Sequence, residues 1–172
     1  MHTSASLLDL HRRTHHSLKG VLDHARTVPP EVIHRTLDAI GPGTIAEKQQ
    51  HVIGAERYWI GVVNGQMLVD EDEADAASVD ALRAFRQRVA ARTRSWLEGM
   101  PDARLATPAL FKQYGGREAT FAPAYAVLRT QTHAFHHIGQ VTAMLRAFGH
   151  PVPPGLDFPM RDLPVDDAAQ GA

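Results

Sequence analysis

The sequence contains no cysteine, which excludes disulfide bonds, thiolate metal ligands and a cysteine nucleophile. It has no apolar run of the ~18 residues that a membrane-spanning helix requires, and Met1 to Ser4 lack the charged and apolar segments of a secretory leader. A formal net charge of −1 gives no basic excess for a nucleic-acid partner. We therefore expect a cytoplasmic protein without membrane or nucleic-acid partners.

What the chain does contain is an ordinary globular composition and many histidines. Its 172 residues are 44% hydrophobic and 22% charged, which suits one domain with a sizeable core. The 11 histidines are an unusual number for this length, and imidazole is both a metal ligand and a group that titrates near neutral pH. Metal or proton chemistry is therefore the first hypothesis to test.

Helical spacing of apolar residues recurs in four segments. It predicts helices over residues 5–27, 44–64, 79–98 and 120–148, each followed by proline or glycine. Thr44 and Glu47 form the T-x-x-E pattern of a capping box at the start of the second helix. The sequence has no convincing strand pattern and no internal repeat, so we expect an all-α protein, a four-helix bundle. Its predicted core includes Leu7, Leu18, Leu22, Ile53, Val62, Phe85, Val89, Ala126, Met144 and Phe148.

The connecting segments carry weaker patterns. Acidic residues 69–78 lack the glycine and glutamate of a calcium-binding EF-hand loop, so we interpret them as a solvated linker long enough for a crossover. Residues 100–119 are expected to be irregular, with a tight turn at Gly115-Gly116. Proline-rich residues 150–165 predict an extended tail packed on a single domain of residues 1–165, and residues 166–172 are expected to be disordered.

The most informative motif is the pair His133 and His137 in the fourth predicted helix. Residues four apart lie one turn apart on the same helix face, so two imidazoles can bind a single metal ion. A metal needs a further ligand, and His51 in the second helix is the best candidate. The alternative is that these rings are core histidines with no metal. Because Ala134 follows His133 where a zincin has glutamate, the motif is not that of a zincin.

Four other residues are candidates for the wall of a pocket or for support of the ligands. Gln140 shares the helix face of His133 and His137 and can orient a ring or a substrate, or it is a core amide. His11 and His15 repeat the four-residue spacing and can line a pocket, serve as general bases or be buried histidines. Glu47 is a candidate second-layer residue, although its capping role also explains it.

Two stretches together resemble the DinB/YfiT-like superfamily. The first is HVIGAERYW at residues 51–59, and the second is HAFHHIGQ at residues 133–140, followed by the GHPVPPGLDFP ending at residues 149–159. The chain departs from the family pattern at Ile138, where members often have arginine. The resemblance implies an up-down-down-up four-helix bundle with a long crossover loop. It also implies one divalent ion, commonly zinc or nickel, bound by His51, His133 and His137, and a homodimer.

Three functions remain open from the sequence. The superfamily includes thiol-dependent S-transferases and isomerases, so the first is a metal-dependent enzyme, a transferase or hydrolase acting on a small molecule, with a low-molecular-weight thiol as co-substrate. The second is a non-catalytic metal-binding or small-ligand-binding bundle with a stress-related role. The third is an interaction bundle without metal. Three neutral imidazoles leave a fourth position open, as in catalytic zinc sites, which favours the enzyme.

Overall fold

The computed structural model describes residues 2–69 and 73–163. Its four long helices are α1 (Ser4–Ala25), α2 (Ile45–Val63), α3 (Val79–Glu98) and α5 (Pro123–Ala147). These lie within three residues of the predicted boundaries, and the predicted all-α class is confirmed. The capping box at the start of α2 is present: the Glu47 amide donates to the Thr44 hydroxyl at 3.1 Å, and the Thr44 amide donates to the Glu47 carboxylate at 2.7 Å.

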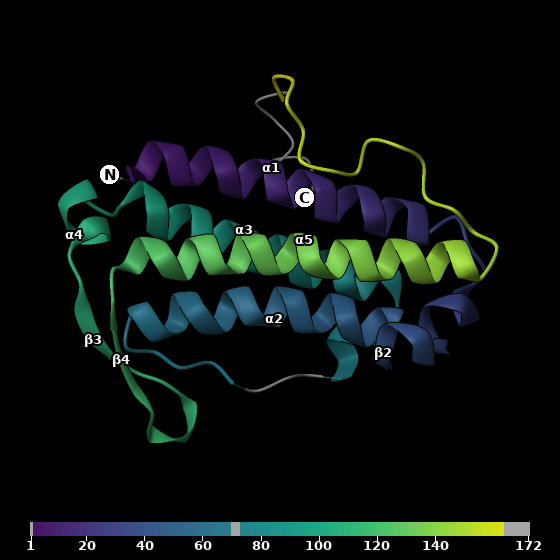
Figure 1. Ribbon diagram of the computed structural model, residues 1–172, viewed down its shortest axis with the longest axis horizontal. Helices are drawn as coiled ribbons and strands as arrows, with labels where there is room; N and C mark the ends of the chain where they lie inside the picture. The colour runs from purple at the N-terminus through teal and green to yellow at the C-terminus, as the bar shows by residue number, and fades with distance from the viewer. Residues whose placement is uncertain (1, 70–72, 164–172) are drawn as a thin grey trace.

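The long helices lie side by side along the length of the molecule (Figure 1). α1 packs against α3 and α5, and α2 packs against the same two helices. Figure 1 shows α1 and α5 running in one direction and α2 and α3 in the other. The short helix η3 (Glu73–Ala76) precedes α3, and its Asp75 accepts from Arg88 at 2.6 Å.

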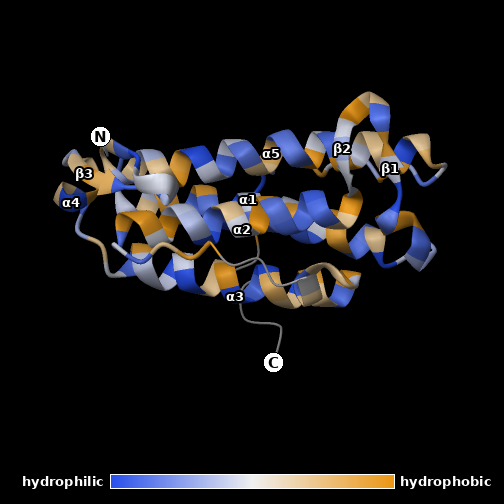
Figure 2. Ribbon diagram, turned by 90° about the horizontal axis from the view of Figure 1, so that it is seen from below, coloured by the Kyte–Doolittle hydropathy of each residue, from blue (hydrophilic) through white to orange (hydrophobic). Residues whose placement is uncertain are grey.

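The core lies between the helices. Each long helix carries hydrophobic and hydrophilic residues along its length, as Figure 2 shows, and the apolar residues face the neighbouring helices. Nine of the ten predicted core residues are buried, and Phe148 is half-buried against them. Burying a leucine or phenylalanine side chain contributes ~1.5–3 kcal/mol, so these contacts are the main force holding the helices together.

Residues 100–119 are more regular than the sequence analysis predicted. They contain the helix α4 (Asp102–Ala106) and the strand β3 (Ala109–Lys112), which pairs antiparallel with β4 (Glu118–Phe121). The expected turn is present, with φ of 74° at Gly115 and 78° at Gly116, values that favour glycine. Strands of four residues are too short for polar-apolar alternation to stand out. The hairpin packs on α2 through aromatic rings. The ring centroid of Phe121 lies 4.8 Å from that of Phe111 and 6.2 Å from that of Trp59 in α2.

A second short hairpin precedes α2. It consists of β1 (Thr36–Leu37) and β2 (Gly41–Thr44), linked by the short helix η2 (Asp38–Ile40), and it follows another short helix, η1 (Pro30–His34). Within the described ranges, both sheets have two strands. These strands were missed because, like β3 and β4, they are too short to show a strand pattern, and β2 also consists largely of glycine and proline.

The proline-rich tail packs on α1 as expected for residues 150–163. Arg13 donates to the backbone carbonyls of Pro159 and Arg161 at 2.6 and 2.9 Å. Leu156 lies against Gly20 so closely that a Cβ there would overlap its side chain, so this helical glycine serves close packing. The predicted disorder of residues 166–172 lies outside the described residues.

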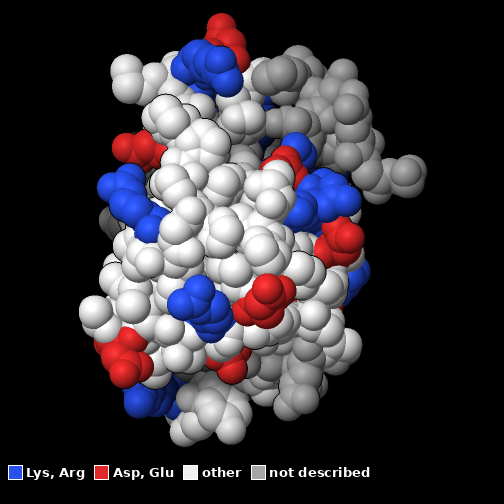
Figure 3. Space-filling view, turned by 90° about the vertical axis from the view of Figure 1, so that its right-hand side faces the viewer, with Lys and Arg blue, Asp and Glu red and all other residues white. Residues whose placement is uncertain are grey.

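The surface of the described residues carries both acidic and basic side chains. On the face shown in Figure 3, acidic and basic side chains are interspersed among uncharged ones. No helix within residues 2–69 and 73–163 is long and apolar enough to cross a membrane.

Candidate metal centre

The structure brings His51, His133 and His137 together at the contact between α2 and α5. The ring of His51 lies 5.1 Å from that of His133 and 5.2 Å from that of His137, measured between centroids. Nε2 of His133 lies 3.1 Å from Nε2 of His137. One nitrogen from each ring can be chosen so that all three lie within 4.8 Å of one another.

This spacing fits a single ion. Two nitrogens bound to zinc at 2.0–2.1 Å in tetrahedral geometry are separated by about 3.3 Å, close to the 3.1 Å found between the α5 rings. His51 is exposed and the α5 rings are half-buried, so the cluster opens to solvent on the α2 side. Nδ1 of His137 is buried and has no partner among the described residues, so the proton that remains there when Nε2 binds metal needs a water as acceptor.

Burial and neighbouring positive charge keep the α5 rings neutral. Burial, and then the proximity of His51 and Arg129, lower the pKa of His133 to about 4. Burial, and then His133 and His51, lower the pKa of His137 to about 4. Near neutral pH both rings therefore carry the lone pairs that a metal requires, and no proton has to be displaced from them.

The other sequence candidates lie in different surroundings. The side-chain amide of Gln140 donates to Nε2 of His136 at 3.2 Å, so Gln140 contacts a ring outside the three-histidine group. Glu47 is exposed, and its carboxylate caps α2 through Thr44. In the structure, Glu47 therefore acts as a helix cap, and Gln140 contacts His136.

His11 and His15 form a second, buried cluster with Glu56. Nε2 of His11 lies 2.9 Å from one carboxylate oxygen of Glu56, and Nε2 of His15 lies 2.8 Å from the other. All three residues are at most 6% exposed. The two rings hold the pKa of Glu56 well below its usual value despite burial, whereas burial lowers the pKa of His15 to about 4. The carboxylate is therefore ionised and accepts from both rings, linking α1 to α2.

Glu56 is the residue to which the sequence analysis assigned no role. It lies five residues after His51, which places it about 140° around α2 on the buried side. A carboxylate on an apolar helix face needs hydrogen-bond donors, and the two α1 histidines are the donors available. An acidic residue among the buried positions of α2 is therefore the feature that could have revealed the cluster.

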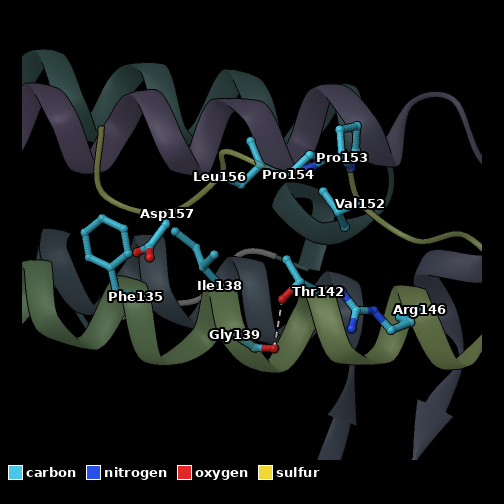
Figure 4. Close-up of a pocket in the computed structure, with 10 residues that line it drawn as sticks. All are labelled: Phe135, Ile138, Gly139, Thr142, Arg146, Val152, Pro153, Pro154, Leu156 and Asp157. Carbon is cyan, nitrogen blue, oxygen red and sulfur yellow. Dashed lines mark hydrogen bonds between the residues drawn. The ribbon is translucent and has the colours of Figure 1, made fainter. Parts of the chain in front are cut away.

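A groove of about 300 Å³ lies elsewhere, between α5 and the tail. Figure 4 shows Phe135, Ile138 and Thr142 projecting from α5 toward residues 152–157. Phe135 and Thr142 are about 180–200° around the helix from His133, so the groove occupies the opposite side of α5. It therefore does not include the three histidines.

Comparison with protein families supports the resemblance found in the sequence. A family model described as the DinB family matches residues 4–163, which covers all four long helices. The chain belongs to the DinB family. A search of curated proteins found no match to the chain. Both three-residue clusters are compatible with a divalent metal in their ligand types and spacing.

Proposed function

We propose that this DinB-family chain binds one divalent transition metal, zinc or nickel, through His51, His133 and His137, and that it is a metal-dependent enzyme. The reaction we infer is a thiol-dependent S-transfer or isomerisation, or a related hydrolysis, on a small-molecule substrate. The observation that carries this proposal is the convergence of three imidazoles from two helices at a solvent-accessible position, with two Nε2 atoms 3.1 Å apart.

The three-histidine group suits a catalytic ion better than the buried cluster does. In the buried cluster, both Nε2 atoms already contact the ionised Glu56, and the positive charge of Arg86 acts on His15, which disfavours a further cation. That cluster is also closed to solvent, whereas exchange of substrate requires access. Around His51, the exposed ring leaves a path from solvent to a fourth position.

The chain's own residues limit the chemistry. When bound, the metal would lower the pKa of a water or thiol at the fourth position. The chain has no cysteine, so any thiolate has to come from a co-substrate such as a low-molecular-weight thiol. The neutral rings of His133 and His137 hold the ion without carrying charge of their own, which leaves its full positive charge to act on the bound group.

Further parts of the proposal follow from the family resemblance. We infer a single domain of residues 1–165, with its helices in an up-down-down-up bundle, and a cytoplasmic homodimer. The pairing of α1 and of α2 with both α3 and α5 supports the bundle, and the shared direction of α2 and α3, opposite to that of α1 and α5, supports its order (Figure 1).

Thiol consumption by metal-loaded protein tests the enzymatic proposal. Untagged protein is loaded with zinc or nickel and incubated with glutathione, bacillithiol or mycothiol and an electrophilic acceptor. We expect turnover that is lost in His133→Ala and retained in His136→Ala. Stoichiometric metal binding without turnover for any of these thiols, or for ester and amide substrates, would instead indicate the non-catalytic metal-binding function. Untagged protein that binds no metal would contradict both.

A further inference from the structure

Arg129 lies on the same side of α5 as the three-histidine group. It precedes His133 by four residues, which places it one turn away and about 40° around the helix. Arg129 is therefore the charged residue next to the proposed metal position in the direction of the β3–β4 hairpin.

An aromatic platform positions the guanidinium of Arg129. Its Cζ atom lies 5.0 Å from the centre of the Trp59 ring, within the range of a cation–π contact. The Trp59 ring is itself held between Tyr58, at 5.3 Å, and Phe121 of the hairpin, at 6.2 Å. The Tyr58 hydroxyl accepts from the backbone amide of Tyr114 at 2.9 Å, which ties the platform to the hairpin turn.

The guanidinium is available to a ligand. Arg129 is exposed, and within residues 2–69 and 73–163 it makes no ion pair with a carboxylate, whereas Arg12, Arg13, Arg83 and Arg88 each do. The cation–π contact with Trp59 acts through the positive charge of the guanidinium and does not require its N–H groups as donors. The resulting arrangement, an arginine fixed by an aromatic ring with open donors, suits a planar anion.

A second cation borders the same group of histidines from α2. Lys48 lies three residues, about one turn, before His51 on α2, and its ammonium donates to the Pro42 carbonyl at 2.7 Å. The acidic residue nearest in sequence, Glu47, is engaged in the α2 cap. Positive charge on both helices that carry the three histidines favours a negatively charged ligand.

From this arrangement we propose that Arg129 is a substrate-binding residue that selects a molecule carrying a carboxylate, with the reacting atom of that molecule at the open metal position. The proposal deepens the proposed function and rests on it. Trp59 supports Arg129 through its cation–π contact. The substrate class is accordingly a small carboxylic acid, in preference to its neutral analogues.

A pair of isosteric thiols tests this selection. The full-length protein is loaded with cobalt(II), and 3-mercaptopropionate or its neutral amide is titrated while the thiolate-to-cobalt absorption band is recorded. We expect the wild type to bind the acid about tenfold more tightly than the amide, as a hydrogen-bonded ion pair provides. In Arg129→Gln the preference should fall to near one, with unchanged cobalt content. Arg129→Lys should retain part of it, because the charge remains but the planar fork is lost.

Arg146→Gln is the matched control, since Arg146 is an exposed arginine of α5 that lines the groove on the opposite side. It should keep the wild-type preference. Equal binding of acid and amide by the wild type, or an unchanged preference in Arg129→Gln, would overturn the role of Arg129 and leave the metal site intact. If neither thiol produces the absorption band on cobalt-loaded wild type, the open metal position is wrong, and the carboxylate selection is rejected with it.

Discussion

His133 and His137 on α5, and His11 and His15 on α1, share the same four-residue spacing, yet different residues complete each set. On α5 the third member is an exposed histidine from α2, and two Nε2 atoms face each other at 3.1 Å. On α1 the third member is the buried carboxylate of Glu56, which accepts from both rings. The four-residue spacing therefore places two rings on one helix face. The residue that α2 brings to that face distinguishes the open cluster, which we propose as a metal site, from the buried cluster, which links two helices.

Removal of the two clusters should also affect the stability of the folded chain in different ways. The α1 cluster contributes to the free energy of unfolding, because its buried groups satisfy one another. The three-histidine group should contribute chiefly when metal is present, since an ion bound only to the folded state stabilises that state. The following variants separate these two roles.

The largest effect is expected from Glu56→Ala in metal-free protein. Removing the carboxylate leaves an N–H donor of each buried ring without an acceptor, at about 1–3 kcal/mol each, so the free energy of unfolding should fall by about 2–6 kcal/mol. Chemical denaturation measures this, with His51→Ala as the control because His51 is exposed and should cost far less. Metal content per folded molecule should be unchanged in Glu56→Ala. A cost below about 1 kcal/mol would show that the cluster is not a structural link.

Metal addition should stabilise a variant of the α1 cluster but not a variant of the three-histidine group. At a free metal concentration one hundred times Kd, the wild type should gain about 2.7 kcal/mol of unfolding free energy. His15→Gln should gain the same amount, whereas His133→Ala should gain almost none. Thermal unfolding with metal and with chelator provides the measurement. Equal stabilisation of His133→Ala and wild type would contradict the assignment of His133 as a ligand.

Acidification should destabilise the metal-free protein between pH 6.5 and 4. The pKa values of His15, His133 and His137 are lowered to about 4 in the folded state, whereas an unfolded histidine titrates near 6.5. The unfolded state therefore binds more protons in this window, so the free energy of unfolding falls as pH falls. The rings of His15 and His11 hold the pKa of Glu56 well below its usual value of 4.5, so the contribution of this carboxylate to the free energy of unfolding is lost only as the pH falls below about 4.5.

Denaturation curves recorded at half-unit steps of pH measure this dependence. One buried histidine changes the free energy by at most about 1.4 kcal/mol per pH unit, so His15→Gln should flatten the slope without abolishing it. An unfolding free energy that rises as pH falls from 6.5 to 4, or an unaltered slope in His15→Gln, would contradict the neutral state of the buried ring.

The smallest effect concerns the helix that carries His51. Thr44→Ala removes the side-chain acceptor of the α2 cap and should cost about 1 kcal/mol. Glu47→Ala should cost a similar or smaller amount, and neither change should release metal, because Glu47 caps the helix and does not contact the three rings. Metal release from Glu47→Ala in folded protein would restore a supporting role for this carboxylate at the site.

The long helices could be predicted from the sequence because each carries an uninterrupted apolar stripe and clear stop residues. Gly115-Gly116 likewise predicted the turn, since two positive φ angles favour glycine. The strands around it could not be predicted, because Ala109–Lys112 and Glu118–Phe121 are short and are stabilised by Trp59, which is distant in the chain.

At the candidate site, helical periodicity placed His133 and His137 on one face, but periodicity within one helix cannot say what lies opposite. That required the packing of α2, which directs His51 toward α5 and Glu56 toward α1. The distinct surroundings of His11 and His15 depend on the same packing, as does the contact of Arg129 with Trp59. These relations arise between helices and are not encoded in the spacing of either one.

The most direct test is the metal content of untagged protein, measured by elemental analysis together with the coordination shell from X-ray absorption. We predict one divalent ion per chain, with ring nitrogens at about 2.0–2.1 Å if it is zinc. Most of the metal should be lost in His51→Ala, His133→Ala and His137→Ala. It should be retained in His136→Ala and in His24→Ala, since His24 lies in the last turn of α1, where its Nε2 is 3.1 Å from the His150 carbonyl oxygen. Full stoichiometry after removal of two of the three ligands would contradict the site and would direct attention to His11 and His15.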